Sequence, residues 1–278
     1  MNAHPTPSHI RQLIDRITPD LSVLWSADRE TRPPPSVIGT PEPGTPALTQ
    51  LDAIHSGLRD TLPAAQGGHS IHAAVTGLAA ALEAVIDQSP DTALAYLFMR
   101  NREDYPVLHV IHCAVIVGLS AAAAGLEPSA RRPVLCAALT QNISMSALQA
   151  DLYHLEGSPG SLDRLLIRRH PVTAVGVLKA LGVEDADWLE AVALHHERCD
   201  GSGYPFGLKG RTIPLGAQLI GAADSYCAAV SARGYRAGRP AHEAMRNLFL
   251  GAGGRCDPGL GRLLVKTLGI YPPGTVID

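Results

Sequence analysis

The sequence predicts an all-α fold, a helical bundle with one glycine-rich loop. From residue 69 onward, apolar residues recur at three- and four-residue spacing, and no segment alternates convincingly as a half-buried strand does. Hydrophobic residues make up 46% of the 278 residues and charged residues 18%, so the chain has enough apolar material for a large core. Because aromatic residues are only 4%, that core must consist mainly of Ala, Leu, Val and Ile.

The N-terminal part of the chain has a different composition. Residues 1–30 predict one or two short helices, and a further helix is predicted over 47–65. Between them, residues 31–46 contain six prolines, which remove backbone donors and favour an extended arm. We therefore expect an N-terminal helical segment with a proline-rich arm over residues 1–64, and a main domain over 65–278.

The main domain is predicted as a series of helices separated by proline and glycine breaks. The Glu-Pro-Ser step at 127–129 and Gly182 are two such breaks. Because a proline inside a helix removes a backbone hydrogen bond, we also expect a break at His170-Pro171. The predicted helices cover residues 71–87, 92–100, 106–125, 130–140, 161–169, 172–181, 185–197, 214–231, 240–250 and 257–268.

Charge and cysteine usage narrow the functional classes. The chain has 23 Lys and Arg against 26 Asp and Glu, a net charge of -3, and no basic run, so we expect no DNA partner. Its five cysteines are scattered without a Cys-x-x-Cys pair, which is typical of a reduced protein rather than a disulfide framework. The N-terminus lacks the apolar stretch of a signal peptide, so a cytoplasmic location is expected.

One segment meets the length criterion for a membrane span. Residues 105–126 contain no Asp, Glu, Lys or Arg. The same residues include His109 and His112 and are rich in Ala and Gly, which favours a buried helix of an all-α core. We therefore predict no membrane span.

The string HHERCDGSGYP, residues 195–205, carries the most chemical information. His195 and His196 stand at the end of a predicted helix, where neighbouring side chains can serve one site. Imidazoles are good ligands for divalent transition metals, and the glycine-rich loop that follows contains turn-forming steps. Alone, the pair also fits two solvent-facing histidines before an ordinary turn.

Further chemically active residues lie elsewhere in the main domain. His112 lies on the helix 106–125, and His170 precedes a proline. Asp224 stands in the otherwise apolar stretch GAADSYCAAV, and a buried carboxylate needs a metal, a cation or hydrogen-bond donors. Arg233 and Arg236 follow it and suit phosphate contact, although cations near a helix C-terminus also have an ordinary structural explanation.

Taken together, the strings HHERCDGSGYP, GAADSYCAAVSARGYRAG and LGIYPPGTVID resemble the HD-GYP family, over roughly residues 70–277. The resemblance implies an all-helical, metal-dependent phosphodiesterase that hydrolyses cyclic di-GMP, a bacterial second messenger. It implies cyclic di-GMP or a related nucleotide as the partner and a divalent transition metal, iron or manganese, as the cofactor. The metal ligands implied by the matching positions are His112, His170, His195, His196 and Asp224.

The motif that gives the family its name is missing. Where the family has Leu-His-Asp-Ile-Gly-Lys, this chain has Leu-Thr-Gln-Asn-Ile-Ser-Met over 139–145, so Gln141 and Asn142 replace the His-Asp pair. Met145 replaces the lysine, and Leu108 stands where some members have a further glutamate ligand. Asparagine keeps the shape of the bridging aspartate but loses its charge, and two-metal hydrolysis needs both ions.

We therefore expect a degenerate member with one well-bound ion or none, and three functional hypotheses follow. The favoured one is a regulator that binds cyclic di-GMP or a signalling partner without efficient turnover. The second is a residual phosphodiesterase with a single metal on His170, His195 and His196. The third is a docking module whose loop Gly203-Tyr204-Pro205 contacts a cyclic di-GMP synthase domain. Since the family lysine is missing at Met145, Arg233 and Arg236 are the candidate phosphate contacts, although solvated charges explain them equally well, and Lys209 and Arg211 are better explained as solvated loop charges.

Overall fold

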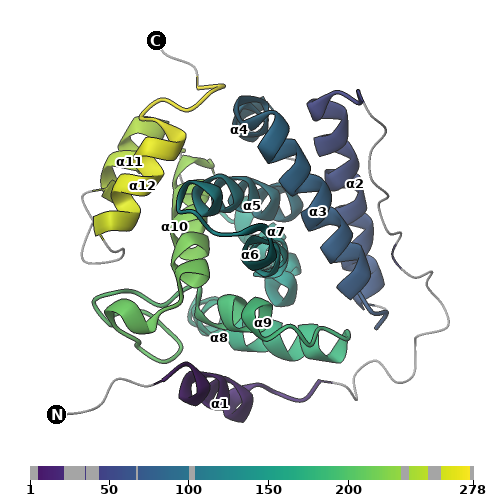
Figure 1. Ribbon diagram of the computed structural model, residues 1–278. Coiled ribbons are helices and arrows are strands. Elements are labelled where there is room, and N and C mark those ends of the chain that lie inside the picture. Colours follow the sequence, from purple (N-terminus) through teal and green to yellow (C-terminus); the bar gives the residue numbers. More distant parts are fainter. Residues whose placement is uncertain are drawn as a thin grey trace.

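A computed structural model describes residues 6–21, 35, 44–66, 68–99, 104–232, 238–249 and 258–275. Over these residues the regular structure is helical, apart from one isolated β-bridge between Asp200 and Lys209, so the all-α prediction is confirmed. Helix α5 (Tyr105–Ala123) runs through the centre of the molecule (Figure 1). Helices α6 (Pro128–Thr140) and α10 (Leu215–Val230) make the most extensive contacts with it.

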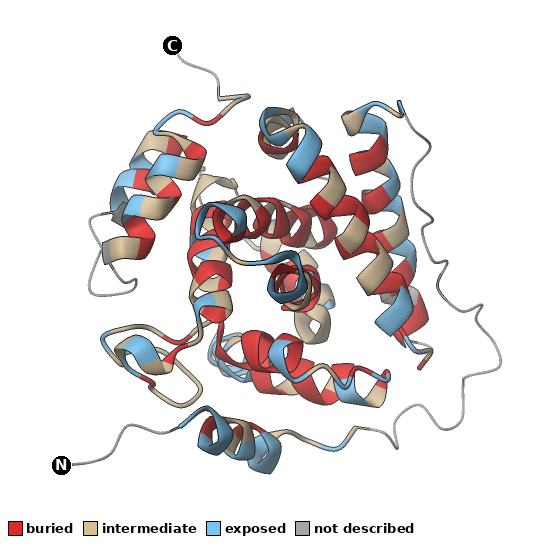
Figure 2. Cartoon of the chain, viewed as in Figure 1, coloured by how far each residue is buried: buried red, intermediate tan, exposed pale blue. Residues whose placement is uncertain are grey.

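Helix α5 is long and apolar enough to cross a membrane by length and composition. However, 72% of its apolar window is buried among the other helices. Figure 2 shows buried residues along most of its length. The helix therefore serves as the core element that the sequence predicts.

Three helices cover one side of this centre: α2 (Ala47–Gln66), α3 (His72–Gln88) and α4 (Pro90–Met99). Leu51, Ile54 and Leu58 of α2 enter the same hydrophobic core as α5. The predicted division at residue 64 thus falls inside α2, which packs as part of the bundle. Most of the proline-rich arm lies outside the described residues.

Helix α8 (Ser161–Ala180) lies beside α9 (Ala186–Leu194). The predicted break at His170-Pro171 is wrong, because α8 continues through Pro171 without interruption. The sequence analysis also missed α7 (Ser146–His154), which follows a 3-10 turn, η3 (Ile143–Met145).

The N-terminal helix α1 (Pro7–Ile17) packs across α9 (Figure 1). Its Ile10 and Ile14 are buried, and its Arg11 donates to the carboxylates of Asp187 and Glu190 on α9. The chain returns from α9 through the glycine-rich loop and η4 (Gly210–Thr212) to α10, and ends with α11 (Ala241–Phe249) and α12 (Pro258–Leu268).

Candidate metal centre

Three histidines meet where α8 passes the end of α9. His170 lies in the middle of α8, and His195 and His196 follow the last residue of α9. One ring nitrogen from each lies within 4.8 Å of the others. The structure thus brings together the three histidines that the sequence analysis proposed as a single-metal site.

The rings of His170 and His195 are oriented by backbone carbonyls. Because Pro171 has no N–H, the carbonyl of Ile167, four residues earlier, lacks its usual helical donor. It accepts instead from Nδ1 of His170 at 2.6 Å. Likewise, Nδ1 of His195 donates to the carbonyl of Val192 at 2.7 Å near the end of α9. Because Nδ1 donates, Nε2 of each ring carries the lone pair that a metal requires.

The separation and charge state of these rings fit one ion. Nε2 of His170 lies 3.2 Å from Nε2 of His195. Two nitrogens that bind one tetrahedral ion at ordinary bond lengths stand about 3.3 Å apart. Burial lowers the pKa of His170 to about 3 and also lowers the pKa of His195 and His196, so all three are neutral near pH 7. Neutral imidazole is the form that ligates metals.

The glycine-rich loop packs directly against this cluster. The ring of Tyr204 stacks on the ring of His196 with centroids 4.7 Å apart, and the guanidinium of Arg168 lies 5.0 Å from the Tyr204 centroid. A Cβ on Gly203 would lie 2.5 Å from Cα of Glu197 and 2.6 Å from the carbonyl oxygen of His196, so only glycine fits there.

The carboxylate of Glu197 closes the same loop. It accepts from the backbone N–H groups of Phe206, Gly207 and Leu208 at 2.6, 3.2 and 2.8 Å. Burial raises the pKa of Glu197, although these three donors oppose that shift. Glu197 therefore positions the loop, a role that the sequence analysis did not assign to it.

A second cluster joins α5 to α10. Nε2 of His109 lies 2.8 Å from Oδ1 of Asp224 and 3.6 Å from Sγ of Cys113. Burial disfavours the imidazolium of His109, but Cys113 and Asp224 outweigh burial and raise its pKa to about 10. Burial also opposes the charge on Asp224, yet the hydrogen bond from His109 holds the pKa of that carboxyl well below its usual range. His109 and Asp224 therefore form an ion pair.

The structure places His109, not His112, beside Asp224. His112 lies three residues further along α5, where its ring meets Tyr96 edge-on with centroids 6.4 Å apart. It belongs to neither group of clustered metal-type side chains among the described residues. The ligand position that the resemblance assigned to His112 is therefore better filled by His109.

Gln141 and Asn142 follow the end of α6 and are buried, and Met145 ends η3. Within the described part of the chain, neither the oxygen nor the nitrogen of the Gln141 side-chain amide has a hydrogen-bond partner. The end of α6 is held by Trp188 of α9, whose indole donates to Thr140 at 2.8 Å. The buried amide of Gln141 is thus a polar group that lacks a partner.

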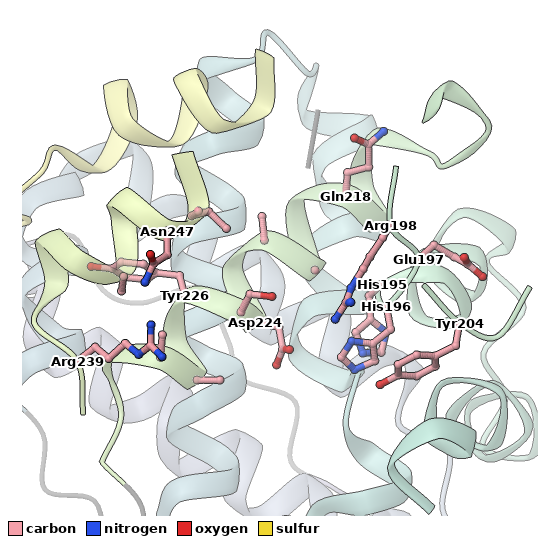
Figure 3. A pocket seen from close by; sticks show the side chains of 17 residues that line it. His195, His196, Glu197, Arg198, Tyr204, Gln218, Asp224, Tyr226, Arg239 and Asn247 are labelled. Atoms are coloured by element: carbon pink, nitrogen blue, oxygen red, sulfur yellow. The ribbon is translucent and has the colours of Figure 1, made fainter. Parts of the chain in front are cut away.

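A cavity of about 510 Å³ lies against both clusters. Figure 3 shows His195, His196 and Tyr204 toward one side, and Arg239, Tyr226 and Asn247 toward the other, with Asp224 between them. Its lining cations are Arg198 and Arg239, neither of which the sequence analysis singled out.

Among the described residues, none of the cations that the sequence analysis proposed lines this cavity. Arg233 and Arg236 lie outside the described residues. Lys209 and Arg211 line a different cavity, of about 850 Å³, beside Arg11 of α1.

Comparison with known proteins identifies one family and several relatives. The family described as HD domain matches residues 95–260. A cyclic di-GMP phosphodiesterase of Pseudomonas aeruginosa is 31% identical over 197 residues, which are 70% of this chain and 47% of the relative. A cyclic di-GMP phosphodiesterase response regulator of Xanthomonas campestris pv. campestris is 31% identical over 144 residues, 51% of this chain and 38% of the relative.

Among solved structures, an HDG"Y"P protein from Bdellovibrio bacteriovorus has a similar fold, with a TM-score of 0.65. It is 16% identical, and the match covers 81% of this chain and 73% of that chain. This chain spans less than half the length of the curated relatives it matches.

Proposed function

This chain belongs to the HD-domain family, and we propose that it is a cyclic di-GMP signalling protein that binds the nucleotide at its histidine centre with little or no hydrolysis. Similarity to cyclic di-GMP phosphodiesterases supports the nucleotide class. The observation that carries the proposal is the cluster of three neutral, oriented histidines beside a cavity lined by Arg198 and Arg239. A cavity of about 510 Å³ is within the usual size range for small-molecule sites.

The recognition chemistry follows from the lining residues. Cyclic di-GMP carries two phosphates and two guanine bases, and arginine side chains suit bidentate contact with phosphate. The ring of Tyr204, which also lines the cavity, offers an aromatic surface next to His196. A divalent transition metal, iron or manganese, held by His170, His195 and His196 would act as a Lewis acid toward a phosphate oxygen.

Weak or absent hydrolysis is proposed from the residues at the end of α6. Gln141 and Asn142 carry no charge where the family resemblance requires a His-Asp pair, and Met145 carries none where it requires a lysine. Two-metal hydrolysis needs a second cation close to the first and anionic ligands to hold it. With neutral amides at these positions, the carboxylate that would bridge two ions is absent, and we infer that this chain keeps its nucleotide intact.

The second candidate is a residual phosphodiesterase with one ion on the three histidines. The 3.2 Å separation of Nε2 in His170 and His195 favours it, because those two ligands are already at the distance that an ion requires. A third candidate, docking of a cyclic di-GMP synthase domain on Gly203-Tyr204-Pro205, stays a prediction.

One pair of measurements separates these candidates. The protein is purified with Mn²⁺ or Fe²⁺ and incubated with cyclic di-GMP, the products are separated by chromatography, and binding is measured by calorimetry. We expect binding, with no linear dinucleotide or GMP above the background of the His195→Ala variant. Product that disappears in that variant would instead establish the residual enzyme, and neither binding nor product would leave the docking module.

A matched pair of arginine variants tests the assigned cavity. Arg239→Ala removes a cation that lines the histidine cavity, whereas Arg211→Ala removes one that lines the other cavity. We expect the first to weaken cyclic di-GMP binding by about tenfold or more, in line with the loss of a charged hydrogen bond, and the second to leave it unchanged. Equal effects of the two variants would contradict this placement of the nucleotide.

A further inference from the structure

The face of α5 that meets α10 carries a regular series of polar side chains. Tyr105, His109 and Cys113 are spaced by four residues, so they lie one above another on the same side of the helix. Asp224 faces them from α10. The side chains of His109 and Cys113 are buried, whereas that of Asp224 keeps 18% of its surface exposed and lines the histidine cavity. An ion could therefore reach this cluster from the cavity through Asp224.

The distances in the cluster suit metal ligands. Sγ of Cys113 lies 3.6 Å from Nε2 of His109. A nitrogen at 2.0–2.1 Å and a sulfur at 2.3 Å from one tetrahedral ion stand about 3.6 Å apart. The 2.8 Å contact between His109 and Asp224 is a hydrogen bond, which an ion would widen by about half an ångström. All three ligand atoms already lie within 4.8 Å of one another.

The same three residue types could also form a nucleophilic triad, but the geometry argues against it. In such a triad one ring nitrogen of the histidine meets the nucleophile and the other meets the acid. Here Cys113 and Asp224 both approach Nε2 of His109. Nδ1 meets the hydroxyl of Tyr105 at 3.3 Å, the outer contact that fixes the ring of a metal-binding histidine.

We propose that His109, Cys113 and Asp224 form a second metal site, with a thiolate ligand that selects zinc over manganese. His109 and Asp224 fill positions at which the family resemblance already implies ligands. The inference goes beyond the proposed function in Cys113, to which neither the family match nor the resemblance gives a role. A thiolate and a carboxylate together balance the charge of a dication, which the neutral Gln141 and Asn142 do not. Thiolate ligands favour zinc, whereas Mn²⁺ prefers oxygen ligands. A bound ion would displace both the thiol proton of Cys113 and the Nε2 proton of His109, since a ligand atom must offer a free lone pair.

Cobalt(II) substitution tests the site without nucleotide or turnover. Co²⁺ bound to a thiolate shows a sulfur-to-metal charge-transfer band in the near ultraviolet, which histidine and carboxylate ligands do not produce. We expect this band in the wild-type protein, its loss in Cys113→Ser, and its retention in Cys136→Ser. Cys136 is a matched control, because it is also a buried free cysteine but lies on α6 outside both clusters. The protein is kept reduced, since Cys227 also contacts the thiol of Cys113.

The zinc affinity of Cys113→Ser should fall by about tenfold or more, while its affinity for Mn²⁺ stays near that of the wild type. No charge-transfer band in the wild type, or a band that survives Cys113→Ser, would overturn the proposal. X-ray absorption of the zinc-loaded wild type needs no variant: a sulfur neighbour at about 2.3 Å supports the site, and a shell of nitrogen and oxygen alone rejects it. Neither result bears on nucleotide binding, so this inference and the proposed function can fail separately.

Discussion

His170 owes its orientation to the proline that follows it. Pro171 deprives Ile167 of its usual N–H donor, and the carbonyl of Ile167 then holds the ring of His170. In Pro171→Ala a backbone N–H competes for that carbonyl, so we expect the ring to loosen and metal affinity to fall by about 10- to 100-fold. Because proline inside a helix is unfavourable, the free energy of unfolding of the same variant should rise by up to about 3 kcal/mol. Metal titration and thermal unfolding measure the two effects.

A second helical proline provides the control. Pro133 lies inside α6, which contributes no residue to the histidine cluster, so Pro133→Ala should change stability without changing metal affinity. Unchanged metal affinity in Pro171→Ala would show that the carbonyl contact does not orient the ring.

At the residue level, the sequence predicted the cluster of His170, His195 and His196 but not the cluster of His109, Cys113 and Asp224. His195 and His196 are adjacent and lie in a specific string, and their grouping with His170 is what the structure shows. His109 and His112, in contrast, lie on one apolar helix about 60° apart around its axis. Only the position of α10 reveals that Asp224 faces His109, and that Cys113 faces the same point. Contacts between helices distant in sequence have no signature in a single chain.

Among the elements, the glycine-rich loop depends on close approach of its backbone to the end of α9. A Cβ at Gly203 would overlap backbone atoms of Glu197 and His196. We expect Gly203→Ala to lower the free energy of unfolding by about 1–3 kcal/mol, the usual cost of overpacking, and to displace Tyr204 from His196. Thermal unfolding gives the first effect, and loss of metal affinity at the neighbouring histidines reports the second.

Gly160→Ala is the matched substitution, since a Cβ there meets only the Asp163 side chain at 3.4 Å. We expect it to leave both unfolding and metal affinity near the wild-type values. Equal loss in the two variants would mean that general helix and loop effects, rather than the contact of Gly203, govern the loop.

The elements that the sequence predicted well are those with strong apolar periodicity. The predicted helix 106–125 differs from α5 by one residue at its start and two at its end. Helix α7 was missed because its short sequence, SALQADLYH, buries only Gln149 and Leu152 and has no apolar stripe. The predicted break in α8 failed because the one backbone hydrogen bond lost at Pro171 is replaced by a side chain: the carbonyl of Ile167 accepts from Nδ1 of His170.

At the scale of the whole molecule, a part-buried ion pair helps to hold α1 on the bundle, together with the buried side chains of Ile10 and Ile14. Arg11 contacts Glu190, whose side chain is 7% exposed, as well as the more exposed Asp187. Arg11→Ala leaves the buried carboxylate of Glu190 without its cation, so we expect a loss of about 1–3 kcal/mol in unfolding free energy. Lys179→Ala breaks the exposed pair with Asp15 and should cost less than about 1 kcal/mol. Chemical denaturation compares them, and an effect of Lys179→Ala as large as that of Arg11→Ala would contradict the assignment.

The histidine centre also joins two consecutive helices, because His170 belongs to α8 while His195 and His196 follow α9. An ion that binds only the folded arrangement stabilises it by mass action, by about 2.7 kcal/mol at a free concentration one hundred times its Kd. We expect Mn²⁺ to raise the unfolding temperature by several degrees, a chelator to reverse the rise, and His195→Ala to abolish most of it.

Mn²⁺ is the ion of choice here, since the proposed thiolate site disfavours it. His9→Ala, which removes an exposed histidine of α1, should respond to Mn²⁺ as the wild type does. If His195→Ala were stabilised equally, the ion would bind elsewhere, and the link between α8 and α9 would rest on side-chain packing alone.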